Sequence, residues 1–168
     1  KFSACLNNQD DLIHVALFGL PNSGKSTLLH LIAEEVHEAK DANDVEYQRV
    51  KFQNLSIIST NFNKDTNIRE VLDNQFHSTQ GFIYLLEDKL EVFKDETNTK
   101  QFDIICKQQQ LFGLPILVFQ RGSDDESFKD VLSILGITPS KTIKVFQYNH
   151  ETGQGVKEGL QWLTSVMF

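Results

Sequence analysis

The chain has 168 residues, 40% of them hydrophobic and 23% charged, a balance typical of a globular domain with its own core. Its net charge of −7 argues against a broad nucleic-acid surface and a polybasic membrane anchor, because both need clustered basic residues. The two cysteines, Cys5 and Cys106, have neither disulfide nor metal-site spacing, so we expect a reducing compartment.

No linker, repeat or low-complexity tract divides the sequence, and we therefore expect one domain over residues 1–168. The chain starts at Lys1, and its only methionine is Met167, so we expect the native initiator to lie upstream. Residues 1–11 are interpreted as an N-terminal extension. A lipidation signal further upstream would lie outside this sequence.

The first two predicted elements flank a glycine-rich motif. An apolar run, Leu12–Phe18, predicts a buried strand, and the apolar spacing that follows predicts a helix over Lys25–Glu38. The motif between them has the spacing G-x-x-x-x-G-K-[ST] of a phosphate-binding loop, or P-loop. Its glycines let backbone N–H groups face phosphate oxygens, and the helix start adds a positive dipole end. The expected phosphate-binding residues are Gly19, Asn22, Ser23, Gly24, Lys25, Ser26 and Thr27.

Two side chains of this motif have distinct expected roles. The ammonium group of Lys25 would reach the β- and γ-phosphates, and the hydroxyl of Ser26 would be a ligand of Mg²⁺. The motif thus predicts binding of a nucleotide polyphosphate.

Strands and helices alternate in the rest of the chain. A polar connection, Lys40–Asp44, precedes two strands joined as a hairpin at Gln53-Asn54. The predicted strands after the first are Val45–Phe52, Leu55–Thr60, Gly81–Leu86, Ile116–Phe119 and Thr142–Phe146. The predicted helices after the first are Thr66–Phe76, Val92–Phe112, Ser127–Leu135 and Gly155–Met167.

This order predicts an α/β P-loop fold with a six-stranded, mostly parallel sheet, one antiparallel edge strand, and helices on both faces. Ligands of such sheets bind at the carboxyl ends of the strands. The loops after residues 18, 60, 86, 119 and 146 are therefore expected to line one site.

Three further stretches are similar to the Arf-like small GTPases of the Ras superfamily. Ser78-Thr79-Gln80-Gly81-Phe82-Ile83 resembles the Arf strand N-T-Q-G-L-I, and Asn67-Ile68-Arg69 falls where Arf proteins often have I-R after switch II. The segment 153–163 resembles the Arf ending G-x-G-(x)2-E-G-L-(x)-W-L. The resemblance covers residues 12–166 and implies a small-GTPase fold, bound GTP or GDP with Mg²⁺, and protein partners. It also implies a location in the cytosol or on the cytoplasmic side of intracellular membranes.

The chain departs from this family in both switches. Switch I normally supplies a threonine ligand to Mg²⁺, but Ala42 or a neighbour falls there. The nearby Asp41 and Asp44 are either solvated loop acids or substitute ligands. The switch II box D-x-x-G-Q is changed at three positions, which hold Asn61, Lys64 and Asp65. Lys64 is either an exposed lysine or a phosphate contact, and the hydrolytic glutamine is absent.

The guanine box N-K-x-D is represented by Arg121-Gly122-Ser123-Asp124. Asp124 either accepts hydrogen bonds from guanine or caps the next helix. Arg121 replaces the asparagine, and its guanidinium can stack on the base. The last box, S-A-[KT], aligns with Asn149-His150-Glu151, where the backbone N–H of His150 would contact the base.

These features favour an Arf-like protein that binds GTP or GDP with little or no hydrolysis and acts through a protein partner. No catalytic residue is assigned, and Mg²⁺ is expected only through Ser26. The alternative is a nucleotide-free pseudo-GTPase that serves as a scaffold subunit. A third reading, a P-loop ATPase, would use Glu87 or Asp88 at the end of a Walker-B-like strand.

Overall fold

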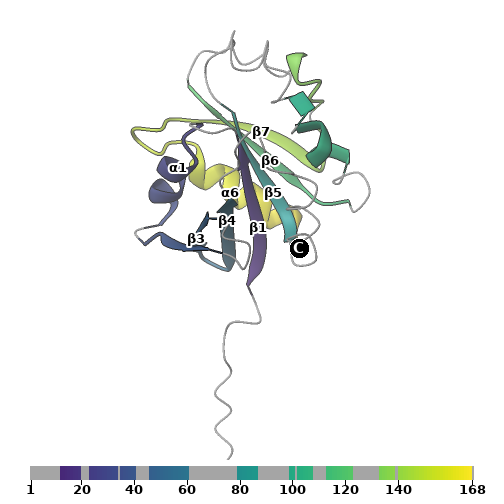
Figure 1. The fold of residues 1–168 in the computed structure, drawn as a ribbon. Coiled ribbons are helices and arrows are strands. Elements are labelled where there is room, and N and C mark those ends of the chain that lie inside the picture. The colour runs from purple at the N-terminus through teal and green to yellow at the C-terminus, as the bar shows by residue number, and fades with distance from the viewer. Residues whose placement is uncertain are drawn as a thin grey trace, which may run out of the picture.

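A computed structural model describes residues 12–19, 23–33, 35–40, 46–60, 79–86, 99–100, 102–107, 113–122, 133–138 and 140–167. Its strands are β1 (Ile13–Gly19), β2 (His37–Lys40), β3 (Glu46–Phe52), β4 (Leu55–Thr60), β5 (Thr79–Leu86), β6 (Ile116–Arg121) and β7 (Ile143–Tyr148) (Figure 1). Its helices include α1 (Lys25–Ile32) and α6 (Val156–Val166), and backbone at 99–100, 102–107 and 133–134 is also helical.

The strands form one sheet in the order β2-β3-β4-β1-β5-β6-β7. Strand β1 lies at its centre and pairs in parallel with β4 and β5, and β6 and β7 continue the parallel half. The β3–β4 hairpin is antiparallel, and it turns at Gln53-Asn54 as the sequence predicts. The α/β fold with a mostly parallel sheet is therefore confirmed.

The predicted number of six strands is wrong, because the sheet has a seventh strand, β2. Helix α1 ends at Ile32 rather than at Glu38, and Ala33 is already extended at φ −141°. The residues of β2 are all exposed, so no apolar alternation distinguishes them from a helix or loop. They pair antiparallel with β3, so this side of the sheet has two antiparallel pairings instead of one. The one reversed strand, β3, therefore lies inside β2 rather than at the predicted edge.

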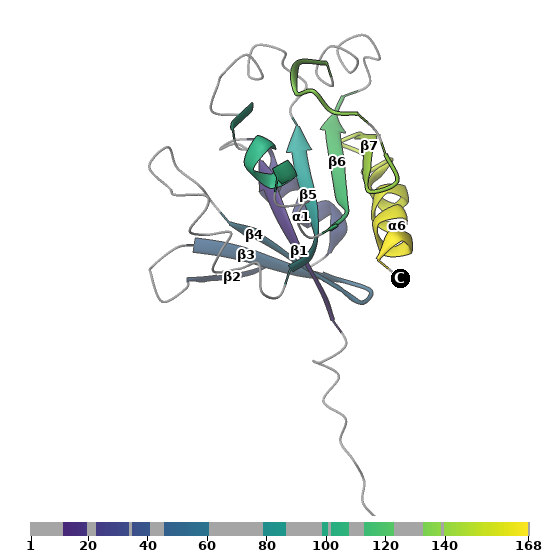
Figure 2. The same ribbon diagram turned by 90° about the vertical axis from the view of Figure 1, so that its right-hand side faces the viewer.

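Two apolar layers cover the faces of the sheet. Helices α1 and α6 lie on one face, where Leu28, Leu29, Leu160 and Leu163 join one buried cluster. The helical segment 102–107 covers the other face in a second cluster, as Figure 2 shows on the opposite side of the strands from α6. Helices on both faces are thus confirmed. The predicted helix Thr66–Phe76 and most of Ser127–Leu135 lie outside the described residues, whereas α6 closely matches its prediction.

Strands β6 and β7 each extend two residues past their predicted ends, to Arg121 and Tyr148. The backbone of Arg121 therefore belongs to the sheet, and the loop begins only after it. In the parts of the chain that the structure describes, no helix has the length and hydropathy needed to span a membrane.

The thiol of Cys106 gives a test of packing in the segment 102–107. Burial raises the pKa of Cys106 to about 11, and the carboxylate of Asp103 adds to the shift. The thiol is therefore protonated below that pH, and only the thiolate reacts. In a Cys5→Ser variant we expect the iodoacetamide alkylation rate to rise about tenfold per pH unit from pH 7 to 10.

The control is the same variant unfolded in guanidinium chloride, where the rate should level off at about pH 9 because an ordinary thiol has a pKa of about 8.5. A folded protein whose alkylation rate also levels off at that pH would contradict the half-buried position of Cys106.

Candidate phosphate-binding site

The glycine-rich motif has the predicted strand–loop–helix context. It follows the central strand β1, and α1 begins at Lys25. Gly24 caps the helix with φ 92° and ψ 25°, a left-handed conformation that glycine adopts without a steric penalty. Its carbonyl accepts the first helical hydrogen bond, from the N–H of Leu28 at 2.9 Å. The positive end of the α1 dipole therefore lies near the carboxyl end of β1.

The Lys25 side chain forms a hydrogen bond back to the first residue of the loop. Its Nζ donates a hydrogen bond of 2.9 Å to the carbonyl oxygen of Gly19, and only 6% of the residue is exposed. A buried ammonium group is costly unless it has polar or anionic partners. This lysine is therefore held at the loop, where it can bind an anion.

Ser23 is a second buried polar group in this loop. The residue is 1% exposed, and its Oγ has no hydrogen-bond partner among the described residues. This Oγ lies 2.7 Å from the point where a Cβ on Gly19 would be. A side chain at position 19 would therefore collide with Ser23. An unsatisfied buried hydroxyl next to Gly19 fits a loop that receives a polar ligand.

Arg121 reaches the same loop from the end of β6. Its Nη1 lies 3.7 Å from the Cβ position of Gly24, and the residue is half-buried. The N–H of Gly122 donates to the carbonyl of Tyr148 at 3.3 Å and joins the ends of β6 and β7. The structure thus brings together Gly19, Ser23, Gly24, Lys25 and Arg121.

Ser26 and Thr27 are exposed in the first turn of α1. The Ser26 hydroxyl accepts a long hydrogen bond of 3.5 Å from Nε2 of Gln48, which also donates to Oε1 of Glu38 at 3.0 Å. Exposure leaves the hydroxyl open to a cation, so Ser26 fits the role of a single Mg²⁺ ligand. Among the described residues, no three His, Cys, Asp or Glu side chains gather as a further metal site.

The neighbours of Ser26 are residues that the sequence did not indicate. Glu38 and Gln48 are directly opposite each other in the β2–β3 ladder. Their approach to Ser26 depends on β2, which has no pattern of its own in the sequence. Gln48 on β3 and Glu38 on β2 lie two and three strands from β1 in the sheet, so the sequence alone could not place them near the motif.

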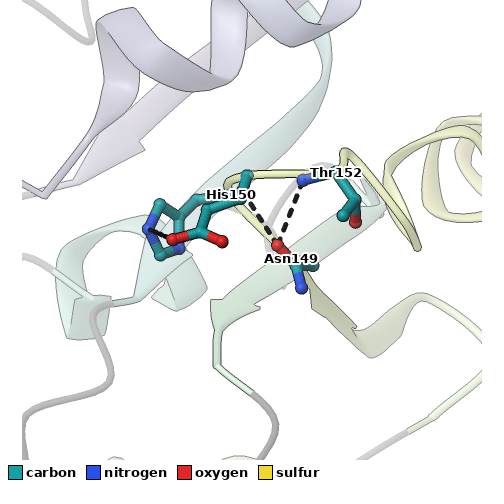
Figure 3. Close-up of polar contacts among 4 residues, drawn as sticks. Asn149, His150 and Thr152 are labelled. Atoms are coloured by element: carbon teal, nitrogen blue, oxygen red, sulfur yellow. Dashed lines mark hydrogen bonds and ion pairs between the residues drawn. The ribbon is translucent and has the colours of Figure 1, made fainter.

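The loop between β7 and α6 is shaped by Asn149 rather than by His150 (Figure 3). Asn149 Oδ1 accepts hydrogen bonds from the N–H groups of Glu151 at 2.8 Å and Thr152 at 3.1 Å. Its carbonyl accepts from Gly153 N–H at 2.8 Å. The His150 ring is exposed and lies 3.9 Å from the Glu151 carboxylate. A base contact from the His150 backbone stays a prediction.

Several predicted positions lie outside the described residues. These are the site residues Asn22 and Asp124, the switch positions Asp41, Ala42, Asp44, Asn61, Lys64 and Asp65, and the alternative metal ligands Glu87 and Asp88. Their roles stay predictions.

Comparison with protein families gives a match over nearly the whole chain. The model described as "Arf: ADP-ribosylation factor family" matches residues 2–167. Comparison with individual curated proteins gives no significant match.

Proposed function

The chain belongs to the ADP-ribosylation factor family and is an Arf-like GTP-binding protein, and we propose that it holds guanine nucleotide with little or no hydrolysis and acts by binding a protein partner. The observation that supports nucleotide binding most directly is the buried Lys25 ammonium, 2.9 Å from the Gly19 carbonyl, beside the left-handed Gly24. Strand, loop and helix are arranged there as phosphate binding requires.

In this proposal each described loop residue has its own role in binding the phosphates. Gly24 places the N-terminus of α1 toward the ligand, and Lys25 supplies a fixed positive charge. The exposed hydroxyl of Ser26 would hold Mg²⁺, which neutralises phosphate charge when bound. In this proposal the affinity comes mainly from the loop, and Asp124 supplies selectivity for guanine.

Weak hydrolysis follows from the residues aligned with switch II. Asp65 takes the place of the glutamine that orients water, and Lys64 takes the place of the glycine. Loss of one positioned group typically costs about 10²- to 10³-fold in rate. Because intrinsic Ras-type hydrolysis is already only about 10⁻⁴ per second, the expected rate is negligible without a partner.

The partner surface that we propose lies at the β2–β3 edge, the counterpart of the family's switch and hairpin region. Val50 of β3 is fully buried and belongs to the core, so it is not available to a partner. Tyr47 is half-buried and lines a shallow hollow of about 280 Å³. The hollow is lined by Glu38, Ala39, Lys40, Glu46, Tyr47 and Gln48.

Titration calorimetry of the purified protein with GTP, GDP and ATP tests this function. We expect GTP and GDP to bind at least about tenfold more tightly than ATP, a difference of about 1.4 kcal/mol. GTP turnover followed by phosphate release should stay at or below about 10⁻⁶ per second, because the loss of about 10²-fold or more applies to an intrinsic rate of about 10⁻⁴ per second. An Asp124→Ala variant is expected to lose the preference for guanine while it keeps binding to ATP.

Failure of all three nucleotides to bind would refute the proposal and favour the alternative, a nucleotide-free scaffold subunit. Preferred binding and rapid turnover of ATP, abolished by Glu87→Gln, would favour the ATPase reading instead.

A further inference from the structure

The side chain of Arg121, the first residue of the guanine box, extends to the phosphate loop. Arg121 is the last residue of β6, and its backbone is fixed beside Tyr148 of β7 in the parallel register. From there its Nη1 reaches to within 3.7 Å of the Cβ position of Gly24. The guanidinium therefore lies over the phosphate loop rather than away from it.

Three positive features converge at this loop. One is the N-terminus of α1, which starts at Lys25, and the second is the Lys25 ammonium itself. The third is the Arg121 guanidinium. A ligand with two or more negative charges is attracted by all three of these features. The buried hydroxyl of Ser23, without a partner among the described residues, offers such a ligand a further hydrogen bond.

Under the proposed function, the ligand at this loop is a nucleotide with a chain of phosphates. The inference about Arg121 rests on that function. We propose that Arg121 binds the phosphate groups of the nucleotide and not its base. The planar guanidinium offers two parallel N–H donors, a geometry that matches phosphate oxygens. Arg121 thus supplies charge at the phosphates, where the aligned switch I and switch II positions lack the usual metal ligands.

Binding of inorganic pyrophosphate separates a phosphate contact from a base contact, because pyrophosphate has no base. We would titrate wild type, Arg121→Gln and Arg121→Lys with pyrophosphate and with GDP, in EDTA so that no metal bridges protein and ligand. Arg121→Gln is expected to weaken both ligands by a similar factor, about 30-fold, typical for the loss of hydrogen bonds between charged groups. Arg121→Lys keeps the charge but loses the paired donors, so we expect an intermediate loss.

Arg49→Gln is the matched control, because it removes the same charge from an exposed position on β3. We expect its affinities for both ligands to stay within about twofold of wild type, since exposed charges are screened by salt. Thermal melting of each variant is used to check that the variant is folded. If Arg121→Gln does not fold, the ratio of the two losses in Arg121→Lys decides the question.

A loss confined to GDP would overturn the inference in favour of base stacking, and an unchanged affinity for both ligands would overturn it in favour of a structural role. Wild type that binds neither ligand would refute the proposed function itself. The wild-type titration therefore tests that function, and the variants test Arg121.

Discussion

Replacement of Lys25 by methionine is expected to weaken GDP binding by about 100-fold and to leave the protein folded. The ammonium group is held in the loop by the Gly19 carbonyl, with 6% of the residue exposed. Truncating one partner of a buried, hydrogen-bonded charge pair costs about 2–5 kcal/mol, so a 100-fold loss is near the lower end of this range. Methionine retains most of the aliphatic length of the lysine side chain.

Calorimetric titration with GDP measures this loss, and thermal melting checks the fold. Lys51→Met is the matched control, because Lys51 is exposed on β3 and its loss changes the net charge equally. We expect its GDP affinity to stay within about twofold of wild type. Equal affinities for the Lys25 and Lys51 variants would show that the loop does not bind the nucleotide phosphates.

The loop and the strands beside it were predictable because their signals are local. The spacing of Gly19, Gly24 and Lys25 lies within seven consecutive residues, and the apolar run before it marks β1. The strand β4 was predicted with its observed bounds, Leu55–Thr60, because the Gln53-Asn54 turn fixes its start. The turn requires φ 52° at Gln53, and the pairing of Phe52 with Leu55 follows from it.

What the sequence could not predict depends on contacts between distant segments. The residues of β2 are all exposed, and its extended backbone is stabilised by pairing with β3 and by the Gln48–Glu38 hydrogen bond. The amphipathic pattern of α1, carried on by Val36, therefore points to a longer helix than the chain forms. The approach of Arg121 to Gly24 spans nearly 100 residues, and it needs the β1-β5-β6 order of the sheet.

Gly155→Ala is expected to destabilise the protein by about 3–4 kcal/mol, which lowers the melting temperature by roughly 10 °C in a domain of this size. Gly155 caps α6 at φ 93° and ψ −20°, a conformation that alanine rarely adopts. The added Cβ would also collide with the carbonyl oxygen of Gln147 and lie 3.2 Å from the Cα of Tyr148. Backbone atoms of β7 cannot move aside without breaking its pairing with β6.

A Gly136→Ala variant distinguishes the stability cost of backbone strain from the cost of a steric collision. Gly136 also has a positive φ, 62°, but among the described residues no heavy atom lies within 4 Å of its Cβ position. Its substitution should cost about 1 kcal/mol, or roughly 3 °C, from conformational strain alone. Thermal unfolding followed by circular dichroism measures both variants. Equal shifts would mean that the β7–α6 connection yields to the added methyl group, and that the loop built on Asn149 is less rigidly placed than its hydrogen bonds imply.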